Sequence, residues 1–325
     1  MQDQPQLKLA TDKLKWIAAT FLLAGVVLGI GAVESRAEVR TDYIYSLSNF
    51  FGLVHSNQAR IYYDEDRKEM YVTDMGVNGV RIFNNRGMEI YRFGDDWNLG
   101  SIIGAVVDKE GNILVLNQTI SKNTIYVCNF RGELKSELTL KGLPSGFENF
   151  SISGMVSWHE QLYLLDNRNM RLLVTDSNGV SRSAYDLASL TGVKEKDRFQ
   201  TAIGGYSVDR EGNILFTVPV LFSAFKLSPD GNISGFGRPG SAPGRFNNAG
   251  GIAADDHGNF FVSDRLKHAI LIFDRNFNFV REFGYLGSKP HNLAGPRDLL
   301  IDDDNQLYVS QFASRGVSVF KITYE

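Results

Sequence analysis

Five histidines are the first side chains to consider for chemistry, and they are His55, His159, His257, His268 and His291. A catalytic zinc site usually takes three protein ligands and leaves one position open for water. These histidines fall at unlike positions of the repeating pattern described below, so we expect them to lie apart in the fold. The sequence therefore predicts surface histidines, and we assign no catalytic residue, metal ligand or cofactor.

A second set of candidates lies at the ends of the second strands in several repeats. These residues are Asp74, Asn117, Asp166 and Asp264. Carboxylate and amide oxygens are the ligands that calcium prefers. Asp and Asn at strand ends also order their own loops by accepting hydrogen bonds from backbone amides. We favour this second role and leave a calcium site open.

Other catalytic signals are weak in these 325 residues. There is no Gly-Lys-Ser/Thr phosphate loop, no Gly-x-Ser-x-Gly elbow and no Cys-x-x-Cys-His haem attachment. The single cysteine, Cys128, lies in an apolar strand pattern, where a lone thiol usually acts as a small buried apolar group. One cysteine also excludes an intramolecular disulfide.

Charge is nearly balanced overall but unevenly distributed. The formal net charge is -3 and the pI is about 6.0, which argues against a general affinity for nucleic-acid phosphates. Turns between the first and second strands of the repeats are mainly acidic. The loops on the opposite side carry the basic candidates for a docking face, which are Arg168, Arg171, Arg245, Arg265, Lys267 and Arg315. Pairing with neighbouring Asp residues is the alternative role for these cations.

One loop of the predicted basic face is apolar. Residues 219–225 read PVLFSAF, and Val220, Leu221 and Phe222 are candidates for a contact patch there. The same loop could instead fold down over its own sheet. Three long connections, 189–201, 236–248 and 285–298, either border the centre of the fold or decorate its surface.

The elements that must position these residues are short strands in a repeating pattern. Six copies of an apolar strand, an acidic turn and a second strand begin at Ile61, Ala105, Met155, Tyr206, Ile252 and Leu299. Third and fourth strands follow, separated by Gly, Asn and Asp turns that are typical of β-hairpins. Strands such as AILIF from Ala269 are apolar on both faces, so both faces must be covered. This pattern predicts an all-β, six-bladed propeller of four-stranded antiparallel blades.

The last copy lacks a fourth strand. It stops after residues 317–325, whereas residues 41–47 have strand composition and no other partner. We expect the N-terminal strand to complete the sixth blade, since an open ring would leave an unpaired edge.

The fifth copy, which starts GGIAADDHGNFFVSD at Gly250, resembles the NHL repeat family of β-propellers. The resemblance covers residues 38–325, although the third copy has Ser157-Trp158-His159-Glu160 in place of the acidic turn. It implies a scaffold whose loop face receives peptides, proteins or, in some members, RNA. Some members are zinc-dependent lyases, and similar propellers include calcium-dependent lactonases.

Residues 1–37 have the composition of an export signal. Three lysines precede an apolar run from Trp16 to Val33, and small residues follow at Ser35 and Ala37. The run is just long enough to cross about 30 Å of hydrocarbon. A cleaved signal peptide and an uncleaved inner-membrane anchor formed by residues 16–33 therefore both stay open. The lysines predict that residues 38–325 are exported in either case, to the periplasm or outside the cell.

These observations together predict a non-enzymatic binding or scaffold propeller in the cell envelope or outside the cell. The expected partner is an envelope or extracellular protein, a peptide or a polyanionic polysaccharide, and not a nucleic acid. The membrane enters only through the possible N-terminal anchor. The alternative is an extracytoplasmic metal-dependent lyase or lactonase-like hydrolase with its site at the mouth of the central channel.

Overall fold

The computed structural model describes residues 38–56, 59–74, 78–95 and 100–325. The chain divides into two units, one made of residues 1–39 and 324–325 and the other of residues 40–323. The fold described below is that of the second unit. The predicted export signal lies outside the described residues. Within the described ranges, no helix combines the length and apolarity needed to cross a bilayer.

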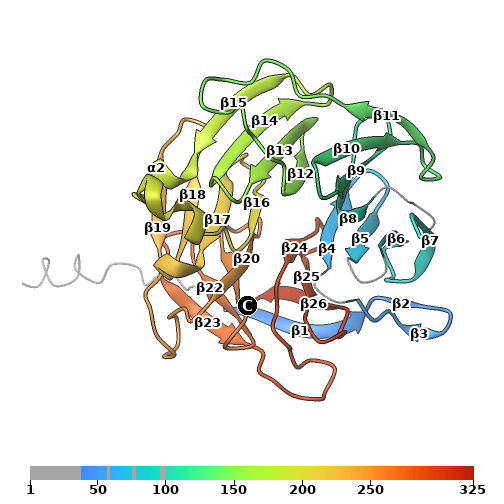
Figure 1. Ribbon diagram of the computed structural model, residues 1–325. Coiled ribbons are helices and arrows are strands. Elements are labelled where there is room, and N and C mark those ends of the chain that lie inside the picture. Colours follow the sequence, from blue (N-terminus) through green and yellow to red (C-terminus); the bar gives the residue numbers. More distant parts are fainter. Residues whose placement is uncertain (1–37, 57–58, 75–77, 96–99) are drawn as a thin grey trace, which may run out of the picture. The chain divides into compact units, whose positions relative to one another are not determined.

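Six four-stranded antiparallel sheets form the blades, as the sequence predicts. The first blade consists of β4 (Arg60–Asp64), β5 (Glu69–Asp74), β6 (Gly79–Phe83) and β7 (Glu89–Phe93). The second consists of β8 (Ser101–Val107), β9 (Ile113–Gln118), β10 (Asn123–Cys128) and β11 (Leu134–Leu138). The third consists of β12 (Gly154–Trp158), β13 (Gln161–Asp166), β14 (Arg171–Asp176) and β15 (Ser181–Asp186). The fourth consists of β16 (Tyr206–Val208), β17 (Ile214–Val218), β18 (Ser223–Leu227) and β19 (Ile233–Phe236). The fifth consists of β20 (Ala249–Ala254), β21 (Phe260–Asp264), β22 (Ala269–Phe273) and β23 (Phe279–Phe283). Figure 1 shows the sheets around a common centre, with the first strand of each blade innermost.

The sixth blade contains strands from both ends of the chain. Its order is β1 (Val39–Ser46), β26 (Val317–Tyr324), β25 (Gln306–Ser310) and β24 (Leu299–Ile301). Just beyond β1, the amide of Leu47 donates to the carbonyl of Val317 at 3.0 Å, and the Leu47 side chain is buried. The N-terminal strand therefore completes the ring, as predicted.

Burial across a blade follows the sequence of its strands. Every residue of β22, with the sequence AILIF, is buried, because neighbouring blades cover both faces of this strand. The outer strand β11 has the sequence LKSEL and is mostly exposed. Core clusters accordingly join adjacent blades, and one cluster contains Leu47, Met70 and Val319 from the blades that meet at the closure.

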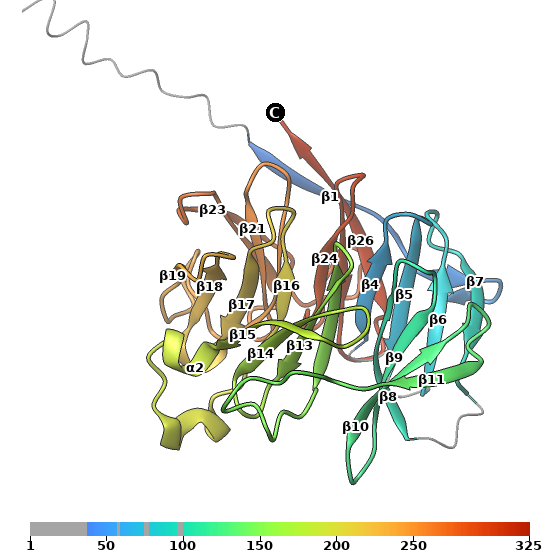
Figure 2. The same cartoon turned by 90° about the horizontal axis from the view of Figure 1, so that it is seen from above.

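The first-to-second turns of all blades and the third-to-fourth turns of the first five blades lie on one side, which we call the turn face. The second-to-third loops and the connections between blades form the opposite loop face. Figure 2 shows the propeller from its side, with the loop between β9 and β10 at the lower edge. Aspartates of the turn face accept hydrogen bonds from backbone amides of their own turns, as Asp108, Asp209, Asp255 and Asp302 do. These aspartates thereby order their tight turns.

Glycine pairs bring the innermost strands of three blades together. A Cβ on Gly204 would lie 2.5 Å from the carbonyl oxygen of Ala249, and one on Gly205 would lie 2.6 Å from the Cα of Gly251. A Cβ on Gly251 would in turn lie 2.9 Å from the amide nitrogen of Leu299. Blades four, five and six thus meet backbone to backbone near the axis, where no side chain would fit.

Few other elements decorate the blades. The connection to the fourth blade contains α2 (Leu187–Leu190) and the 3-10 helix η1 (Glu195–Gln200), and a second 3-10 helix, η2 (Pro219–Leu221), follows β17. Asp186 caps α2 by accepting the amide of Ser189 at 3.1 Å. A small hairpin of β2 (Ser48–Asn49) and β3 (Gly52–Leu53) precedes the first blade.

Candidate functional site

A narrow cavity follows the axis of the propeller and is lined by the innermost strands of all six blades. Its volume is about 160 Å³. Pockets that enclose a drug-sized ligand usually measure about 300 to 1,000 Å³. The channel therefore admits only a small group, and any larger ligand has to lie over one of its mouths.

The channel mouth on the loop face contains an ion pair between the first and sixth blades. Nη1 of Arg60 lies 3.8 Å from Oδ1 of Asp298, and the amide of Ile61 donates to Oδ2 at 3.3 Å. The Asp298 side chain is only 13% exposed. Burial raises the pKa of Asp298, and the charge of Arg60 opposes that rise.

Two further arginines place their charges near this pair. Burial lowers the pKa of Arg297 to about 10, and the positive charges of Arg60 and Arg265 act in the same direction. The guanidinium of Arg265 lies 4.2 Å from the centre of the Phe312 ring. We call Arg60, Arg265, Arg297 and Asp298 the arginine mouth. With three guanidinium groups and one carboxylate, it carries excess positive charge.

Backbone contacts between blades five and six position the arginine mouth. The Arg297 carbonyl accepts the amide of Gly251 at 2.6 Å and the hydroxyl of Ser263 at 3.1 Å. The amide of Arg297 donates to the carbonyl of Ser310 at 2.8 Å, and the amide of Asp298 donates to the Ser310 hydroxyl at 3.0 Å. The chain is thus held on both sides as it enters β24.

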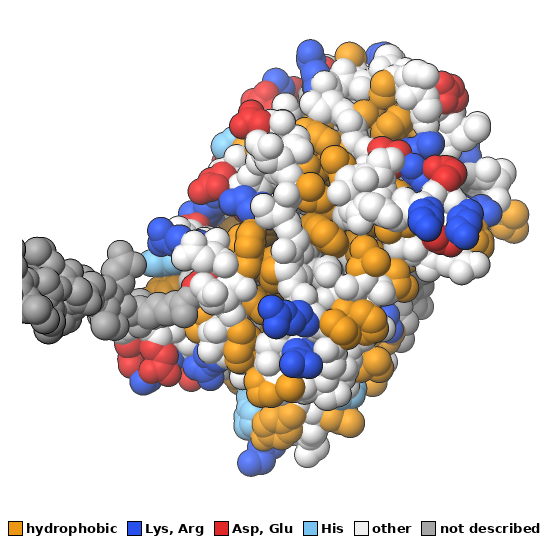
Figure 3. Space-filling model, turned by 90° about the vertical axis from the view of Figure 1, so that its left-hand side faces the viewer, with side chains coloured by type: hydrophobic (Ala, Val, Ile, Leu, Met, Phe, Trp, Pro, Cys, Tyr) orange, Lys and Arg blue, Asp and Glu red, His pale blue; other side chains and the backbone are white. Residues whose placement is uncertain are grey.

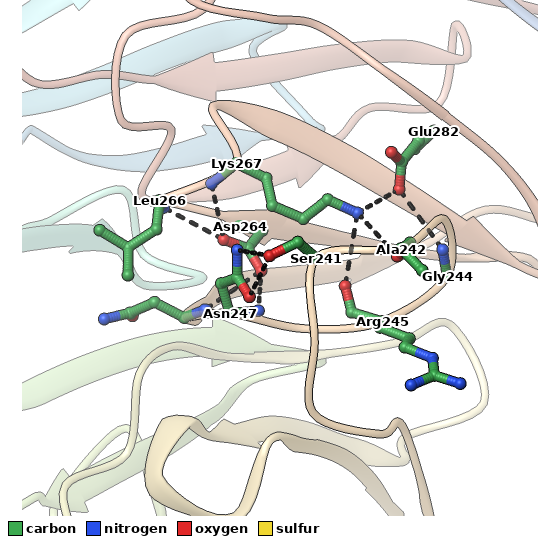
Figure 4. Close-up of polar contacts among 10 residues, drawn as sticks. Ser241, Ala242, Gly244, Arg245, Asn247, Asp264, Leu266, Lys267 and Glu282 are labelled. Carbon is green, nitrogen blue, oxygen red and sulfur yellow. Dashed lines mark hydrogen bonds and ion pairs between the residues drawn. The ribbon is translucent and has the colours of Figure 1, made fainter.

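The predicted docking residues play different parts on the loop face. Arg168 and Arg171 lie over phenylalanine rings, at 4.7 Å from the centre of Phe199 and 5.4 Å from that of Phe147. Arg168 and Arg265 are exposed, and each guanidinium is held against a ring, which leaves its edge available to a ligand. Arg245 is also exposed, and Figure 4 shows its guanidinium pointing away from the surrounding polar contacts.

Lys267 and Arg315 use their charges inside the fold. The Lys267 ammonium lies 2.5 Å from Oε2 of Glu282 and also donates to the carbonyls of Ala242 and Arg245, so it ties the 236–248 connection to the fifth blade (Figure 4). Its side chain is only 8% exposed. Arg315 donates to three carbonyl oxygens of the 285–298 connection, those of Gly287, Lys289 and Asn292.

The apolar 219–225 loop is divided between surface and core. Val220 is 54% exposed and Leu221 is 38% exposed, whereas Phe222 packs against the core cluster shared by the fourth and fifth blades. The two exposed side chains form a small apolar feature. On the flank that Figure 3 shows, hydrophobic side chains are interspersed with charged and other side chains.

The long connections contribute little to the lining of the channel. Of the 285–298 connection, only its last residue, Asp298, lines the cavity, and no residue of 189–201 or 236–248 is among the described residues that do so. Arg198 fixes the 189–201 connection beside blades three and four through Asp186 at 2.6 Å and the carbonyl of Asn169 at 3.2 Å.

Two of the carboxylates considered as calcium ligands accept hydrogen bonds from backbone amides of the loop that follows them and of the connection that precedes their blade. Asp264 accepts from Asn247, Asn248, Leu266 and Lys267, and Asp166 accepts from Ser151 and Asn169. Asn117 is fully buried, and neither of its side-chain polar atoms has a hydrogen-bond partner among the residues that the structure describes. The preferred role in loop ordering is thus observed for the two aspartates.

The histidines have separate surroundings. His55 contacts the carbonyl of Ser314, His159 stacks on Trp158, His268 accepts the amide of Gly295, and His291 approaches Tyr285. Among the described residues, no three His, Cys, Asp or Glu side chains form a group that could hold a metal ion. Cys128 is buried, and burial raises the pKa of its thiol to about 11.

Sequence reasoning missed Arg60 and Asp298. Each precedes or begins the innermost strand of its blade, at the start of the first and sixth repeats. Comparing the residues just before the first strand of each repeat could have found this site. The sixth repeat alone has Arg followed by Asp there, at Arg297 and Asp298.

Comparison with known proteins agrees with the fold. No protein-family model and no curated protein matches the chain. The structure resembles a streptogramin B lyase (12% identity, TM-score 0.56, covering 90% of this chain and 100% of that one). It also resembles a gluconolactonase from Xanthomonas campestris (12% identity, TM-score 0.55, covering 90% and 93%) and a Bacteroides thetaiotaomicron protein of unknown function (13% identity, TM-score 0.60, covering 88% and 77%).

Identities this low establish the fold alone. The protein is a six-bladed β-propeller, and its structural neighbours bear the names of a lyase, a gluconolactonase and a protein of unknown function.

Proposed function

We propose that this protein is an exported, NHL-type binding propeller whose arginine mouth receives an acidic group of its partner. The observation that carries the proposal is the ion pair of Arg60 and Asp298 at the loop-face end of the channel, with the charge of Arg297 acting on Asp298 and that of Arg265 acting on Arg297. The proposed role is docking rather than catalysis.

The electrostatics of the mouth favour an anion. The depressed pKa of Arg297 reflects burial and the unfavourable proximity of like charges, which a bound carboxylate or phosphate would relieve. Guanidinium groups bind such anions with two parallel hydrogen bonds. The narrow channel admits only the anionic group, so the rest of the partner lies over the loop face against Arg168, Arg245 and the exposed side chains of η2.

The partner class follows from chemistry and from the predicted export. Carboxylates are abundant on proteins, peptides and polyanionic polysaccharides of the envelope and the exterior. Nucleic acid is a poor candidate because export separates the protein from cytoplasmic RNA and because the net charge is negative.

The experiment compares two sets of charge reversals. Arg168→Glu, Arg245→Glu and Arg265→Glu change the exposed loop face and leave the buried Lys267 pair intact. Lys109→Glu, Arg210→Glu and Arg275→Glu make the same change in charge on the turn face. We expect the first set to abolish capture of native partners from an envelope extract and the second set to retain it. Equal capture by both would refute docking on the loop face.

The rival function is a metal-dependent lyase or hydrolase at the channel mouth. Metal analysis of protein purified without chelator tests it directly, because stoichiometric zinc or calcium would support the enzyme.

A further inference from the structure

The β2–β3 hairpin presents two phenylalanines to solvent. Phe50 is 91% exposed and Phe51 is 94% exposed, and their rings meet edge to face with centroids 5.6 Å apart. They occupy the two-residue turn between Asn49 and Gly52. Exposed aromatic pairs of this kind are unusual on a soluble surface and indicate a contact site.

The hairpin is held firmly at its base. The Asn49 side chain accepts the Phe51 amide at 2.9 Å, and the Ser48 amide donates to the carbonyl of Gly87 at 2.8 Å. Leu47 and Val54, which flank the hairpin and are joined by a 3.0 Å backbone hydrogen bond, are both buried. The turn is therefore displayed in a defined position.

Further exposed apolar side chains continue the surface along the edge of the first blade. The Ser48 hydroxyl contacts the Met88 sulfur at 3.4 Å, and the Tyr91 hydroxyl donates to the carbonyl of Arg131, next to Phe130. We call this set the aromatic flank; it consists of Phe50, Phe51, Met88, Ile90, Tyr91 and Phe130, each at least 40% exposed.

Basic side chains border the aromatic flank. Arg131 lies 5.3 Å from the centre of the Phe130 ring, and Arg86 is exposed in the turn before Met88. The acidic residue in the same strand, Glu89, is paired with Arg81 at 2.8 Å and is mostly buried. Apolar aromatic side chains with a basic border complement the interface of an anionic bilayer.

We propose that the aromatic flank contacts an anionic lipid bilayer and that Phe50 and Phe51 enter its interfacial region. This role is separate from the arginine mouth and does not depend on the proposed docking function.

The test uses the full-length chain with a polarity-sensitive dye on Phe51→Cys. The native Cys128 is buried, so it leaves the introduced thiol as the reactive one. Ile120→Cys, at a fully exposed position in the β9–β10 loop, is the matched control. With vesicles containing phosphatidylglycerol, we expect a blue shift and quenching by brominated lipid at position 51 and neither at position 120.

Three outcomes would overturn the proposal. The dye at position 51 could stay in water, both positions could shift equally, or position 51 could shift with protein concentration in the absence of vesicles, which would indicate a second copy as the partner. Arg86→Glu with Arg131→Glu should abolish the shift on anionic vesicles, and an unchanged melting temperature would show that the fold is intact.

Discussion

The guanidinium of Arg60 and the carboxylate of Asp298 face each other at 3.8 Å across the junction where the ring of blades closes. Asp298 is the one negative charge of the arginine mouth, and it therefore competes with any incoming anion.

Asp298→Asn should strengthen anion binding at the mouth. The variant removes a competing charge, and charges about 4 Å apart interact by roughly 1 to 4 kcal/mol near a protein surface. We expect the sulfate concentration that half-saturates the thermal shift to fall several-fold. Asp304→Asn, on the turn face, should leave it unchanged. An unaltered sulfate response in Asp298→Asn would argue against the mouth as an anion site.

Gly251→Ala should destabilise the propeller, because its Cβ would lie 2.9 Å from the Leu299 nitrogen and 3.0 Å from the Asp298 Cα. Backbone atoms cannot move aside, so we expect a loss of about 1 to 3 kcal/mol in urea unfolding. Gly104→Ala is the control, since its Cβ would approach nothing nearer than 3.8 Å. Equal stability of the two variants would contradict close packing at the axis.

Leu47→Ala should weaken ring closure. Leu47 is 1% exposed between the first and sixth blades, so its truncation should cost about 2 to 5 kcal/mol. Ile44→Ala, at a 44% exposed position of β1, should cost far less. Deletion of residues 41–47 would leave the outer edge of β26 without its partner strand and should yield an aggregating product in size-exclusion chromatography. A monodisperse, equally heat-stable deletion would refute closure by β1.

Lys267→Met should lower stability rather than affect docking alone. The change leaves Glu282 and two carbonyls without their donor, and we expect a cost of about 1 to 3 kcal/mol, since Glu282 is partly exposed and can be rehydrated. Arg265→Met, two residues away and exposed, should change the melting temperature little. The reverse ranking of these two variants would show that Lys267 is dispensable to the fold.

The pair of Asp186 and Arg198 should make stability depend on pH at the acidic end. Partial burial alone would raise the pKa of Asp186, but hydrogen bonds from Arg198 and Ser189 lower it overall. A lowered folded pKa contributes stability above the unfolded pKa, near 3.9, and this contribution is lost as pH falls through the folded value.

Asp186→Asn keeps a good helix cap and removes the charge. We expect the wild type to be more stable by about 0.5 to 1 kcal/mol at pH 7, because the carboxylate is one-third exposed. The difference should shrink as pH falls below the unfolded pKa near 3.9 and vanish once pH has fallen through the lower folded pKa. A constant difference across the range would show that the charge is not responsible.

The sequence by itself determined the architecture. Strands such as AILIF in β22, the Asp turns and the missing last strand are local signals, because side-chain alternation and turn chemistry act over a few residues. Six blades and closure by β1 followed from these signals.

Only the tertiary structure decided which charges are available. Lys267 and Arg168 occupy similar loops, yet one is buried against Glu282 and the other lies exposed over Phe199. The arginine mouth likewise depends on ring closure, which brings Arg60 beside Asp298 from the opposite end of the chain. Such contacts depend on how blades pack against one another, and a repeat pattern carries no information about its neighbours across the ring.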